Sequence, residues 1–383
     1  MIKLNLPSVM NRSVDPANRI YVLILLGWVA MFALACSGNT PKPAETLIFY
    51  RTTDGQVRSI NPRTKEQEVI LTSRKGDSIR YATLSPDLKF IIYGRHTNQG
   101  EAVWLSNING ANPIRVNSPY TITGAGWLAQ DRIILYGANG FYKRADEGEI
   151  KLYDPYTKQI RSLQSSQNLF TCGENTPTTT FGYLSIANEF GSALGHLEVK
   201  DKELGFVPDV WLNLSQIPDL RGGFCQSWTQ HLEKIIFTGS LDGRLADLYL
   251  ATERGQRITR LTDFSRNYNQ SWVGPFTISP DGNWALSIVH LAESKRRDHP
   301  TGSFLVLVDT RTGDLTDLGK FNSEGNIAWS PEGRFAAVGL SAKDPVTDPE
   351  KWDLYILDIA TKKLEQITFD GKASTVIDWV QVP

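Results

Sequence analysis

The chain has 383 residues, of which 41% are hydrophobic and 21% are charged, and its formal net charge is −1. This composition is that of a globular protein able to bury a sizeable core, and the near-neutral charge argues against a nucleic-acid partner or a general attraction to acidic lipid. The length exceeds that of a usual single domain, so either two domains or one large repeat architecture is expected.

The first segment has the layout of an export signal. Residues 1–19 carry three basic side chains and a single acid, Asp15, and an uncharged apolar run, IYVLILLGWVAMFALA, follows at 20–35. A basic segment, an apolar run of this size and small residues at its end are typical of a secretory signal, and the run is short for a relaxed membrane span. We therefore predict export and an extracytoplasmic location.

The apolar run ends in ALACS, which resembles the lipobox of bacterial lipoproteins, where the cysteine is acylated and becomes the mature N-terminus. The resemblance implies lipidation at Cys36. Ala33 stands where leucine is usual, so an uncleaved membrane anchor is the alternative for residues 1–36. Residues 37–45 are polar and contain proline, which indicates a flexible linker. Both interpretations predict a tether to a membrane: the outer membrane, with the protein in the periplasm, in a two-membrane cell, and the outer face of the cell membrane otherwise.

Two cysteines, Cys172 and Cys225, follow Cys36. In an oxidising compartment they are candidates for one disulfide, and two buried free thiols are the alternative. Both lie near the starts of adjacent predicted repeats, but sequence separation alone does not establish the geometry of a bond.

Internal repeats organise residues 46–383. Three segments share an apolar residue, Ser-Pro-acid, usually Gly, and then an apolar run: LSPDLKFIIYGR at 84–95, ISPDGNWALSIV at 278–289 and WSPEGRFAAVGL at 329–340. Proline presets φ, serine and aspartate bond to nearby backbone, and glycine accepts the left-handed position that closes a hairpin. Each segment predicts a turn between two strands, in which Asp87, Asp281 and Glu332 are structural.

A second hairpin follows each first one and ends near Leu-Thr. Five copies are clear: VWLSNINGANPIRVNS at 103–118, IKLYDPYTKQIRSLQ at 150–164, DLYLATERGQRITRLTDF at 247–264, FLVLVDTRTGDLTDLGKF at 304–321 and DLYILDIATKKLEQITFD at 353–370. Alternating apolar residues and glycine-containing turns predict period-2 strands, and no long helical pattern separates them. The pattern therefore predicts units of four antiparallel strands.

The spacing of the repeats predicts their number. The 194 residues between Ser85 and Ser279 hold about four repeats of close to 49, and the slot at 168–221 is the most degenerate. The chain ends with STVIDWVQVP, which looks like the first strand of a repeat, whereas residues 46–73 look like the other three. Sharing one blade between the two ends removes an exposed edge. We predict a single all-β propeller over 46–383 with seven four-stranded blades, or six if 168–221 is not a full blade.

The Ser-Pro-Asp-Gly hairpin, the D-[IL]-Y-[IVL] strand and the terminal Leu-Thr resemble TolB-type propeller repeats, which are similar to those in propeller domains of prolyl oligopeptidase relatives. The likeness covers most of 46–383 and is poorest in one blade. In that broad group the propeller is commonly a binding platform or a gate, so the resemblance implies a binding role. The chain stops at Pro383 with the closing strand, so peptidase activity of that kind is not expected.

Catalytic and metal-binding motifs are missing from the sequence. We find no G-x-S-x-G elbow, H-E-x-x-H motif, P-loop or zinc-type cysteine spacing, and the five histidines are each isolated: His96, His196, His231, His290 and His299. We therefore predict no catalytic residue, metal or cofactor. Four tryptophans recur at the ends of inner strands, where packing between blades is expected and lining of a ligand channel is the alternative: Trp127, Trp228, Trp329 and Trp379.

Loop lengths indicate one binding face. In a four-stranded blade the first-to-second and third-to-fourth turns share one face, and these are short throughout. The loops of the other face are predicted to be long and charged, at 95–101, 138–149, 265–272, 291–302 and 341–352. The candidate binding residues on this face are Tyr142, Lys143, Arg144, Tyr268, Lys295, Arg296, Arg297 and Trp352. The alternative is that these loops only keep the surface soluble.

The leading hypothesis is a noncatalytic, membrane-tethered extracytoplasmic scaffold that binds an envelope protein or glycan. The alternative is a propeller-type carbohydrate lyase or hydrolase whose acids and histidine converge in a channel-facing site. A third option, a sensor domain of a larger envelope complex, differs from the first only in its partner.

Overall fold

Almost all regular structure in this chain is β-strand. The computed structural model describes residues 45–382, except for 74–75, 99, 117–121, 130–131, 138–150, 163–182, 189–190, 201–202, 213–216, 218–219, 221–225, 230–232, 241–244, 296–298, 324 and 342–350. Residues 45–382 cluster into one compact unit. The described part contains one short 3-10 turn, η4 (Phe264–Arg266), and none of its helices has the length and apolarity needed to span a membrane.

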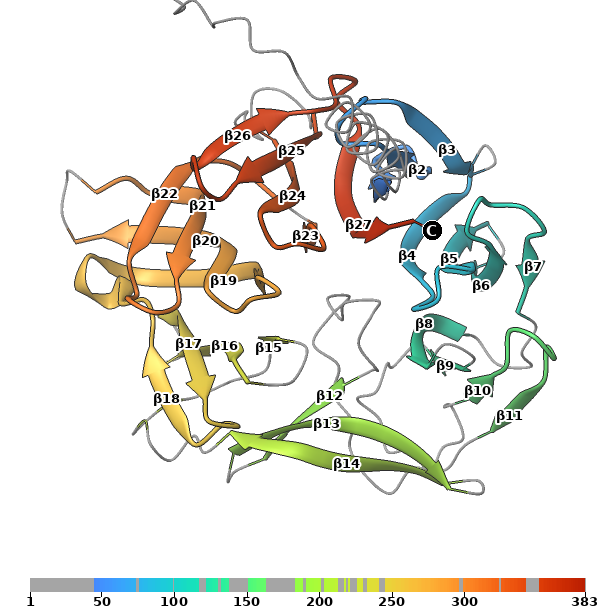
Figure 1. The fold of residues 1–383 in the computed structure, drawn as a ribbon, viewed down its shortest axis with the longest axis horizontal. Coiled ribbons are helices and arrows are strands. Elements are labelled where there is room, and N and C mark those ends of the chain that lie inside the picture. The colour runs from blue at the N-terminus through green and yellow to red at the C-terminus, as the bar shows by residue number, and fades with distance from the viewer. Residues whose placement is uncertain are drawn as a thin grey trace, which may run out of the picture. The chain divides into compact units, whose positions relative to one another are not determined.

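The described strands form seven sheets, six with four strands and one with three, and the pairing within each sheet is antiparallel (Figure 1). The predicted all-β architecture is confirmed. The first half of the chain contributes β1 (Thr46–Thr52), β2 (Val57–Ile60), β3 (Gln67–Leu71), β4 (Ser78–Leu84), β5 (Phe90–Thr97), β6 (Gly100–Asn107), β7 (Ile114–Arg115), β8 (Ile122–Ala129), β9 (Arg132–Gly137), β10 (Lys151–Tyr153), β11 (Ile160–Ser162), β12 (Tyr183–Asn188) and β13 (Gly191–Lys200). The second half contributes β14 (Glu203–Leu212), β15 (Gln226–Trp228), β16 (Ile235–Ser240), β17 (Ala246–Thr252), β18 (Arg257–Arg260), β19 (Tyr268–Ile278), β20 (Trp284–Ser294), β21 (Gly302–Asp309), β22 (Leu315–Lys320), β23 (Ile327–Trp329), β24 (Phe335–Leu340), β25 (Asp353–Asp358), β26 (Lys363–Gln366) and β27 (Ala373–Gln381).

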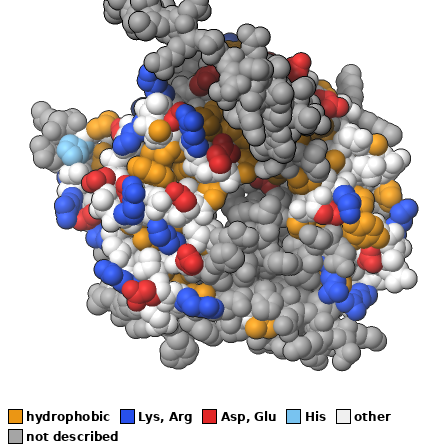
Figure 2. Space-filling model, in the orientation of Figure 1, with side chains coloured by type: hydrophobic (Ala, Val, Ile, Leu, Met, Phe, Trp, Pro, Cys, Tyr) orange, Lys and Arg blue, Asp and Glu red, His pale blue; other side chains and the backbone are white. Residues whose placement is uncertain are grey.

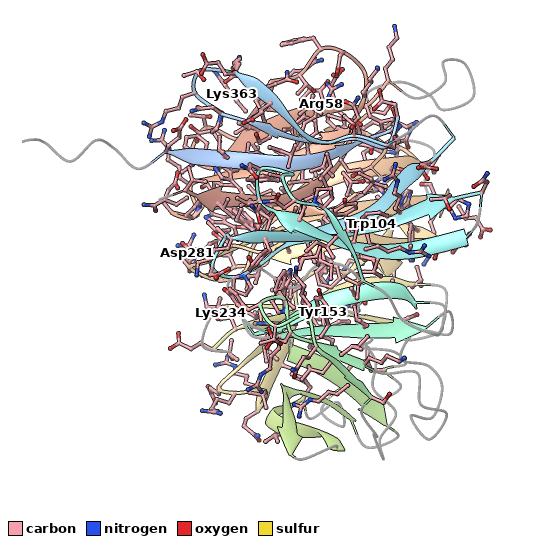
Figure 3. All side chains as sticks on the ribbon, turned by 90° about the vertical axis from the view of Figure 1, so that its right-hand side faces the viewer. Arg58, Trp104, Tyr153, Lys234, Asp281 and Lys363 are labelled. Carbon is pink, nitrogen blue, oxygen red and sulfur yellow. The ribbon has the colours of Figure 1, made fainter. Side chains whose placement is uncertain are left out.

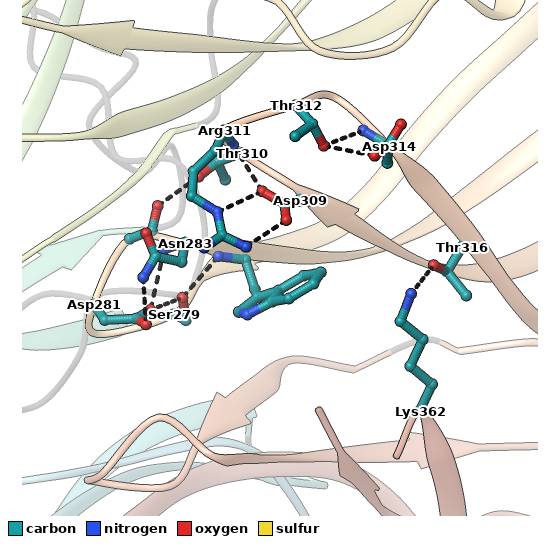
Figure 4. Close-up of polar contacts among 12 residues, drawn as sticks. Ser279, Asp281, Asn283, Asp309, Thr310, Arg311, Thr312, Asp314, Thr316 and Lys362 are labelled. Carbon is teal, nitrogen blue, oxygen red and sulfur yellow. Dashed lines mark hydrogen bonds and ion pairs between the residues drawn. The ribbon is translucent and has the colours of Figure 1, made fainter. Parts of the chain in front are cut away.

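The turns predicted from the Ser-Pro-acid segments are present. Ser279 is fully buried; its hydroxyl donates to Asp281 Oδ1 at 2.5 Å, and its Oγ accepts from Trp284 N at 3.0 Å (Figure 4). Gly282 follows at φ +68°, in the left-handed region that glycine adopts freely. The serines of the other two turns make the same backbone contact, Ser85 Oγ with Phe90 N at 2.9 Å and Ser330 Oγ with Phe335 N at 3.0 Å. The signature is therefore structural.

The second signature, an aspartate before the third strand's apolar run and a Leu-Thr after the fourth strand, closes the outer part of a sheet. Asp247 Oδ1 accepts from Thr262 Oγ1 at 2.7 Å and from Phe264 N at 3.0 Å. Its Oδ2 accepts from Arg260 Nη2 at 2.6 Å, and Thr262 Oγ1 accepts from Leu248 N at 3.0 Å. A matching clasp holds the sheet β23–β26, with Asp353 Oδ1 accepting from Thr368 Oγ1 at 3.0 Å and Gly371 N at 3.1 Å.

Aromatic pairs pack one sheet against the next. Phe90, five residues after Ser85, stacks on Trp127 with ring centroids 6.5 Å apart, and Phe335, five residues after its own turn serine, stacks on Trp379 at 6.3 Å. The other two tryptophans of this set lie buried in clusters that join neighbouring sheets: Trp228 and Trp329. The structure therefore gives all four tryptophans the packing role that the sequence predicted.

Hydrophobic clusters continue this packing through the domain. One cluster contains side chains of β16 and β17 together with side chains of β19, β20 and β21. Further clusters join the sheet β19–β22 to β23–β26, that sheet to the one holding β27 and β1, and this last one to β4–β7. Two more join β4–β7 to β8–β11 and β12–β14 to β15–β18. Each described sheet therefore shares a core with at least one sheet next to it in the chain.

The two ends of the domain share one sheet, as predicted. β27 pairs with β1, and Val376 lies opposite Tyr50, both fully buried. Val382 N donates to Glu45 O at 2.8 Å. The chain therefore enters and leaves this sheet at the same end of the strands at which other sheets have the Ser-Pro-acid turn. The neighbouring sheet lies very close, because a Cβ on Gly339 would be 2.3 Å from Ser374 O.

Several loops predicted to be long are shorter in the structure. The segment 95–101 is a hairpin turn, because β5 and β6 extend into it. Their last cross-strand pair is Thr97 with Gly100. The segments 265–272 and 291–302 are partly the ends of β19 and β20. The remaining loops, 138–149 and most of 341–352, lie outside the described residues. Strands β5, β19 and β20 thus extend further than the repeated segments do. The repeat alone predicts loops at these positions, because the extensions lie outside its pattern.

Candidate functional site

Three residues of the predicted binding face lie in the described part of the chain: Tyr268, Lys295 and Trp352. Tyr268 and Lys295 belong to one hairpin, since Tyr268 begins β19 and Lys295 directly follows β20. Trp352 lies elsewhere, directly before β25, where it forms an isolated bridge with Lys372. The others lie outside the described residues, as do the predicted lipidation and disulfide positions: Tyr142, Lys143, Arg144, Arg296, Arg297, Cys36, Cys172 and Cys225.

The two described aromatic candidates are buried. Tyr268 is 6% exposed and its hydroxyl donates to Pro300 O at 2.9 Å, so its ring anchors the loop that follows β20. Trp352 is 4% exposed. Lys295 is exposed, and its Nζ donates to Ser265 O at 2.6 Å. Both rings therefore have packing roles, and the binding face as a whole stays a prediction.

The hairpin β19–β20 extends beyond the common repeat. β24 ends at Leu340, ten residues after Ser330, whereas β20 continues to Ser294, fifteen residues after Ser279. We call the part of β19–β20 from Tyr268 to Trp272 and from His290 to Ser294 the hairpin extension. Its cross-strand partners include Trp272 with His290 and Gln270 with Ala292. This sheet thus carries a two-stranded segment that the sheet β23–β26 lacks.

Trp272 is the most distinctive side chain of the hairpin extension. It is 59% exposed, although the core contains most other large aromatics, and its indole stacks on the His290 imidazole with centroids 4.8 Å apart and planes 25° apart. Burial alternates from Gln270 to Val273, so Gln270 and Trp272 are exposed whereas Ser271 and Val273 are buried. Alternate residues of a strand share a face, and Gln270 therefore lies on the same face as Trp272.

His290, the cross-strand partner of Trp272, packs against one face of the indole. Its Nδ1 lies 2.5 Å from Ser303 Oγ, and Ser303 is 8% exposed. A glycine, Gly274, faces the imidazole, and a Cβ there would lie 3.3 Å from Ile288 O and 3.9 Å from His290 Nε2. Burial lowers the pKa of His290 below its usual value of 6.5. The imidazole is therefore neutral near pH 7 and is held in one orientation.

Acidification is expected to destabilise the domain through His290. Because the folded state binds the imidazole proton less readily than the unfolded chain, the unfolded state binds more protons below about pH 6.5, and stability rises with pH in that window. We expect the free energy of unfolding to fall between pH 7.5 and pH 5.5 by more in the wild type than in His290→Gln. Urea denaturation at both pH values checks this, and identical pH dependence in the two proteins would contradict it.

Polar groups at the opposite, turn-bearing end of the sheets are paired with one another. Lys234 Nζ donates to Gly282 O at 2.8 Å and to Asn283 Oδ1 at 3.2 Å, and Figure 3 shows Lys234 and Asp281 on the same side of the molecule. Hydrogen bonds from Arg311 to Asp309 lower the pKa of that carboxyl to about 2 (Figure 4). These contacts join turns and neighbouring sheets, so this cluster has a structural role.

On the face drawn in Figure 2, charge does not single out a second site among the described residues. Basic and acidic side chains are interspersed over the described surface in Figure 2, in keeping with the net charge of −1. Within the described ranges, no three His, Cys, Asp or Glu side chains are grouped as a metal site would require. The hairpin extension is therefore the candidate that its exposure and its departure from the repeat support.

The sequence contained a signal for Trp272 that was missed. The apolar run after Ser279 continues past the length of its counterpart after Ser330. Comparing the lengths of these runs would have indicated an extended hairpin that includes Trp272. The contact with His290 could not be read in this way, because it depends on the register of the two strands.

Comparison with known proteins adds information on the fold. No protein-family model matches the chain. No curated protein matches it either. Solved structures similar to it include TolB from Acinetobacter baumannii, at 15% identity and a TM-score of 0.46, covering 88% of this chain and 66% of that one. An oligogalacturonate lyase from Vibrio parahaemolyticus is 10% identical with a TM-score of 0.48, covering 87% of this chain and 90% of that one.

A protein from Lactobacillus plantarum is 12% identical with a TM-score of 0.50, covering 88% of this chain and 98% of its own. At identities this low, similarity concerns the fold alone. The function of this chain therefore has to be argued from its own side chains.

Proposed function

We propose that this protein is a noncatalytic, extracytoplasmic binding scaffold, tethered to a membrane through residues 1–36, which binds an envelope protein or glycan at the hairpin extension. The observation that carries the proposal is the exposed indole of Trp272, stacked on the partly buried imidazole of His290, which Ser303 orients. Exposed aromatic rings on a rigid support are typical anchors of binding surfaces, because they bring large contact area at little cost in side-chain entropy.

The scaffold of this proposal is a seven-bladed propeller. The six four-stranded sheets supply six blades, and the sheet β12–β14 supplies the seventh with its three described strands. The shared cores between neighbouring sheets and the sheet made from both chain ends support a closed ring. In such a ring the first strand of each blade is held by its neighbours, so a hairpin that extends from one blade has a rigid base.

Glu45, where the described chain begins, and Trp272 lie at opposite ends of the strands of their respective sheets. The described chain enters the domain at Glu45, at the strand end that corresponds to the Ser-Pro-acid turns of the other sheets. Trp272 lies six residues from the end of its strand at Ile278, which is about 20 Å along β19 from its turn. The proposed site is therefore remote from Glu45, the residue at which a tether would join the domain.

The proposal is tested by capture from cell envelopes with the full-length tagged protein. We expect crosslinking of the wild type to recover a specific partner or glycan, and Trp272→Ala to reduce recovery at least fivefold. Phe369→Ala is the matched control, since Phe369 is an exposed aromatic, at 72%, in the sheet-connecting loop before β27. Equal recovery with Trp272→Ala and wild type would rule out this site. Accumulation of cleaved glycan would instead favour the lyase or hydrolase alternative.

A further inference from the structure

The hairpin extension also carries information on the chemical class of its ligand. We infer that Trp272, Gln270 and His290 form a carbohydrate subsite, in which a pyranose ring stacks on the open face of the Trp272 indole. This inference rests on the proposed function and selects the glycan over the protein partner.

The indole offers one face to a ligand. The His290 ring lies nearly parallel to it at 4.8 Å and covers the other face, whereas 59% of the Trp272 surface is exposed. The face of an aromatic ring carries negative partial charge, and C–H bonds that carry positive partial charge are attracted to it. A pyranose presents such a row of C–H bonds on one side of its ring. The support by His290 and Ser303 holds the indole in one position, so little entropy is lost when a sugar binds.

Gln270 supplies the polar contacts that a sugar needs beside the stacking face. It is exposed, two residues before Trp272 on the same face of β19, and so about 7 Å away along the strand. An amide both donates and accepts hydrogen bonds, as sugar hydroxyls do. The residue opposite Gln270 is Ala292, whose small side chain leaves this side of the hairpin open. A ring stacked on Trp272 would therefore place its hydroxyl substituents within reach of the Gln270 amide.

The three groups of the subsite are uncharged near pH 7. The indole and the amide carry no charge, and burial keeps the imidazole neutral. The exposed ammonium of Lys295, the nearest described cation in the chain after β20, donates to Ser265 O. Neutral or N-acetylated sugars suit these groups, since their binding needs stacking and hydrogen bonds and no ion pair.

The test uses the full-length protein in detergent micelles with two neutral probes, chitohexaose and cellohexaose. Calorimetric titration is expected to show binding of at least one, with an affinity at least tenfold weaker for Trp272→Ala. Trp272→Phe keeps an aromatic face and should retain part of the affinity, and Gln270→Ala should weaken binding several-fold. Phe369→Ala should bind as the wild type does. Circular dichroism confirms that each variant is folded.

Two results would overturn the inference: neither hexasaccharide binds the wild type, or Trp272→Ala binds it as well as the wild type does. The outcome for the proposed function is separate. If neither sugar binds but Trp272→Ala still prevents capture of an envelope protein, the carbohydrate subsite is wrong and the binding scaffold stands. If a sugar binds through Trp272 but no envelope component is captured, the subsite stands and the scaffold role fails.

Discussion

Val376→Asp is expected to prevent the domain from folding. Val376 is fully buried in β27, opposite Tyr50 of β1, and it belongs to the cluster that joins this sheet to β23–β26. A carboxylate placed there has no cationic partner in the cluster. Burial of an unpaired charge costs several kcal/mol, and a typical domain is stable by only about 5–15 kcal/mol.

The physical consequence is larger than the loss of one side chain. If β27 leaves the sheet, β1 becomes an exposed edge strand, and the aromatic contact between Trp379 and Phe335 is lost as well. We therefore expect loss of near-UV circular dichroism, rapid proteolysis and aggregation. Gln381→Asp is the control, because Gln381 lies in the same strand but is exposed. A folded Val376→Asp protein with the wild-type Tm would show that the shared sheet is dispensable.

Asp247→Ala is expected to lower the free energy of unfolding by about 3 kcal/mol. The carboxylate is 1% exposed and accepts hydrogen bonds from Thr262, Phe264 and Arg260. Without it, a buried hydroxyl and a buried backbone N–H lose their acceptor. The guanidinium keeps its contact with Asp263 at 2.8 Å, which limits the loss.

Chemical denaturation measures this effect. Asp247→Asn retains an oxygen acceptor for Thr262 but turns an N–H donor toward the guanidinium, so we expect an intermediate loss of stability. Asp314→Ala, at an exposed aspartate in another sheet, should change stability by less than about 0.5 kcal/mol. Similar stability of Asp247→Ala and Asp314→Ala would contradict a clasp that holds the sheet together.

These two changes separate the scaffold from the site. Neither residue belongs to the hairpin extension, so both should act through folding, whereas Trp272→Ala should act on binding with the scaffold intact, because its side chain is 59% exposed. The contrast reflects how the molecule is built. Repeated turns, clasps and aromatic pairs make the sheets alike, and a hairpin that outgrows the repeat is where an individual function can be added.

Local chemistry explains what could be predicted from the sequence alone. The Ser-Pro-acid turns, the period-2 strands and the shared terminal sheet depend on residues close in the chain or on the match of one repeat to another. The turn hydroxyl of Ser279, for example, bonds within five residues. The motif that contains Asp247 could be recognised in the sequence because it repeats. The hydrogen bonds that its carboxylate accepts could not be recognised there.

Tertiary structure decided the candidate site. The sequence placed Tyr268 and Trp352 on a binding surface, but packing by neighbouring strands and loops buries both rings. Conversely, Trp272 was assigned to a loop, and only the register of β19 against β20 sets its indole on His290. Turn chemistry and periodicity are local, so they determine the strands and their hairpins. Which side chains remain exposed depends on burial and stacking between strands and sheets that meet across long separations in the chain.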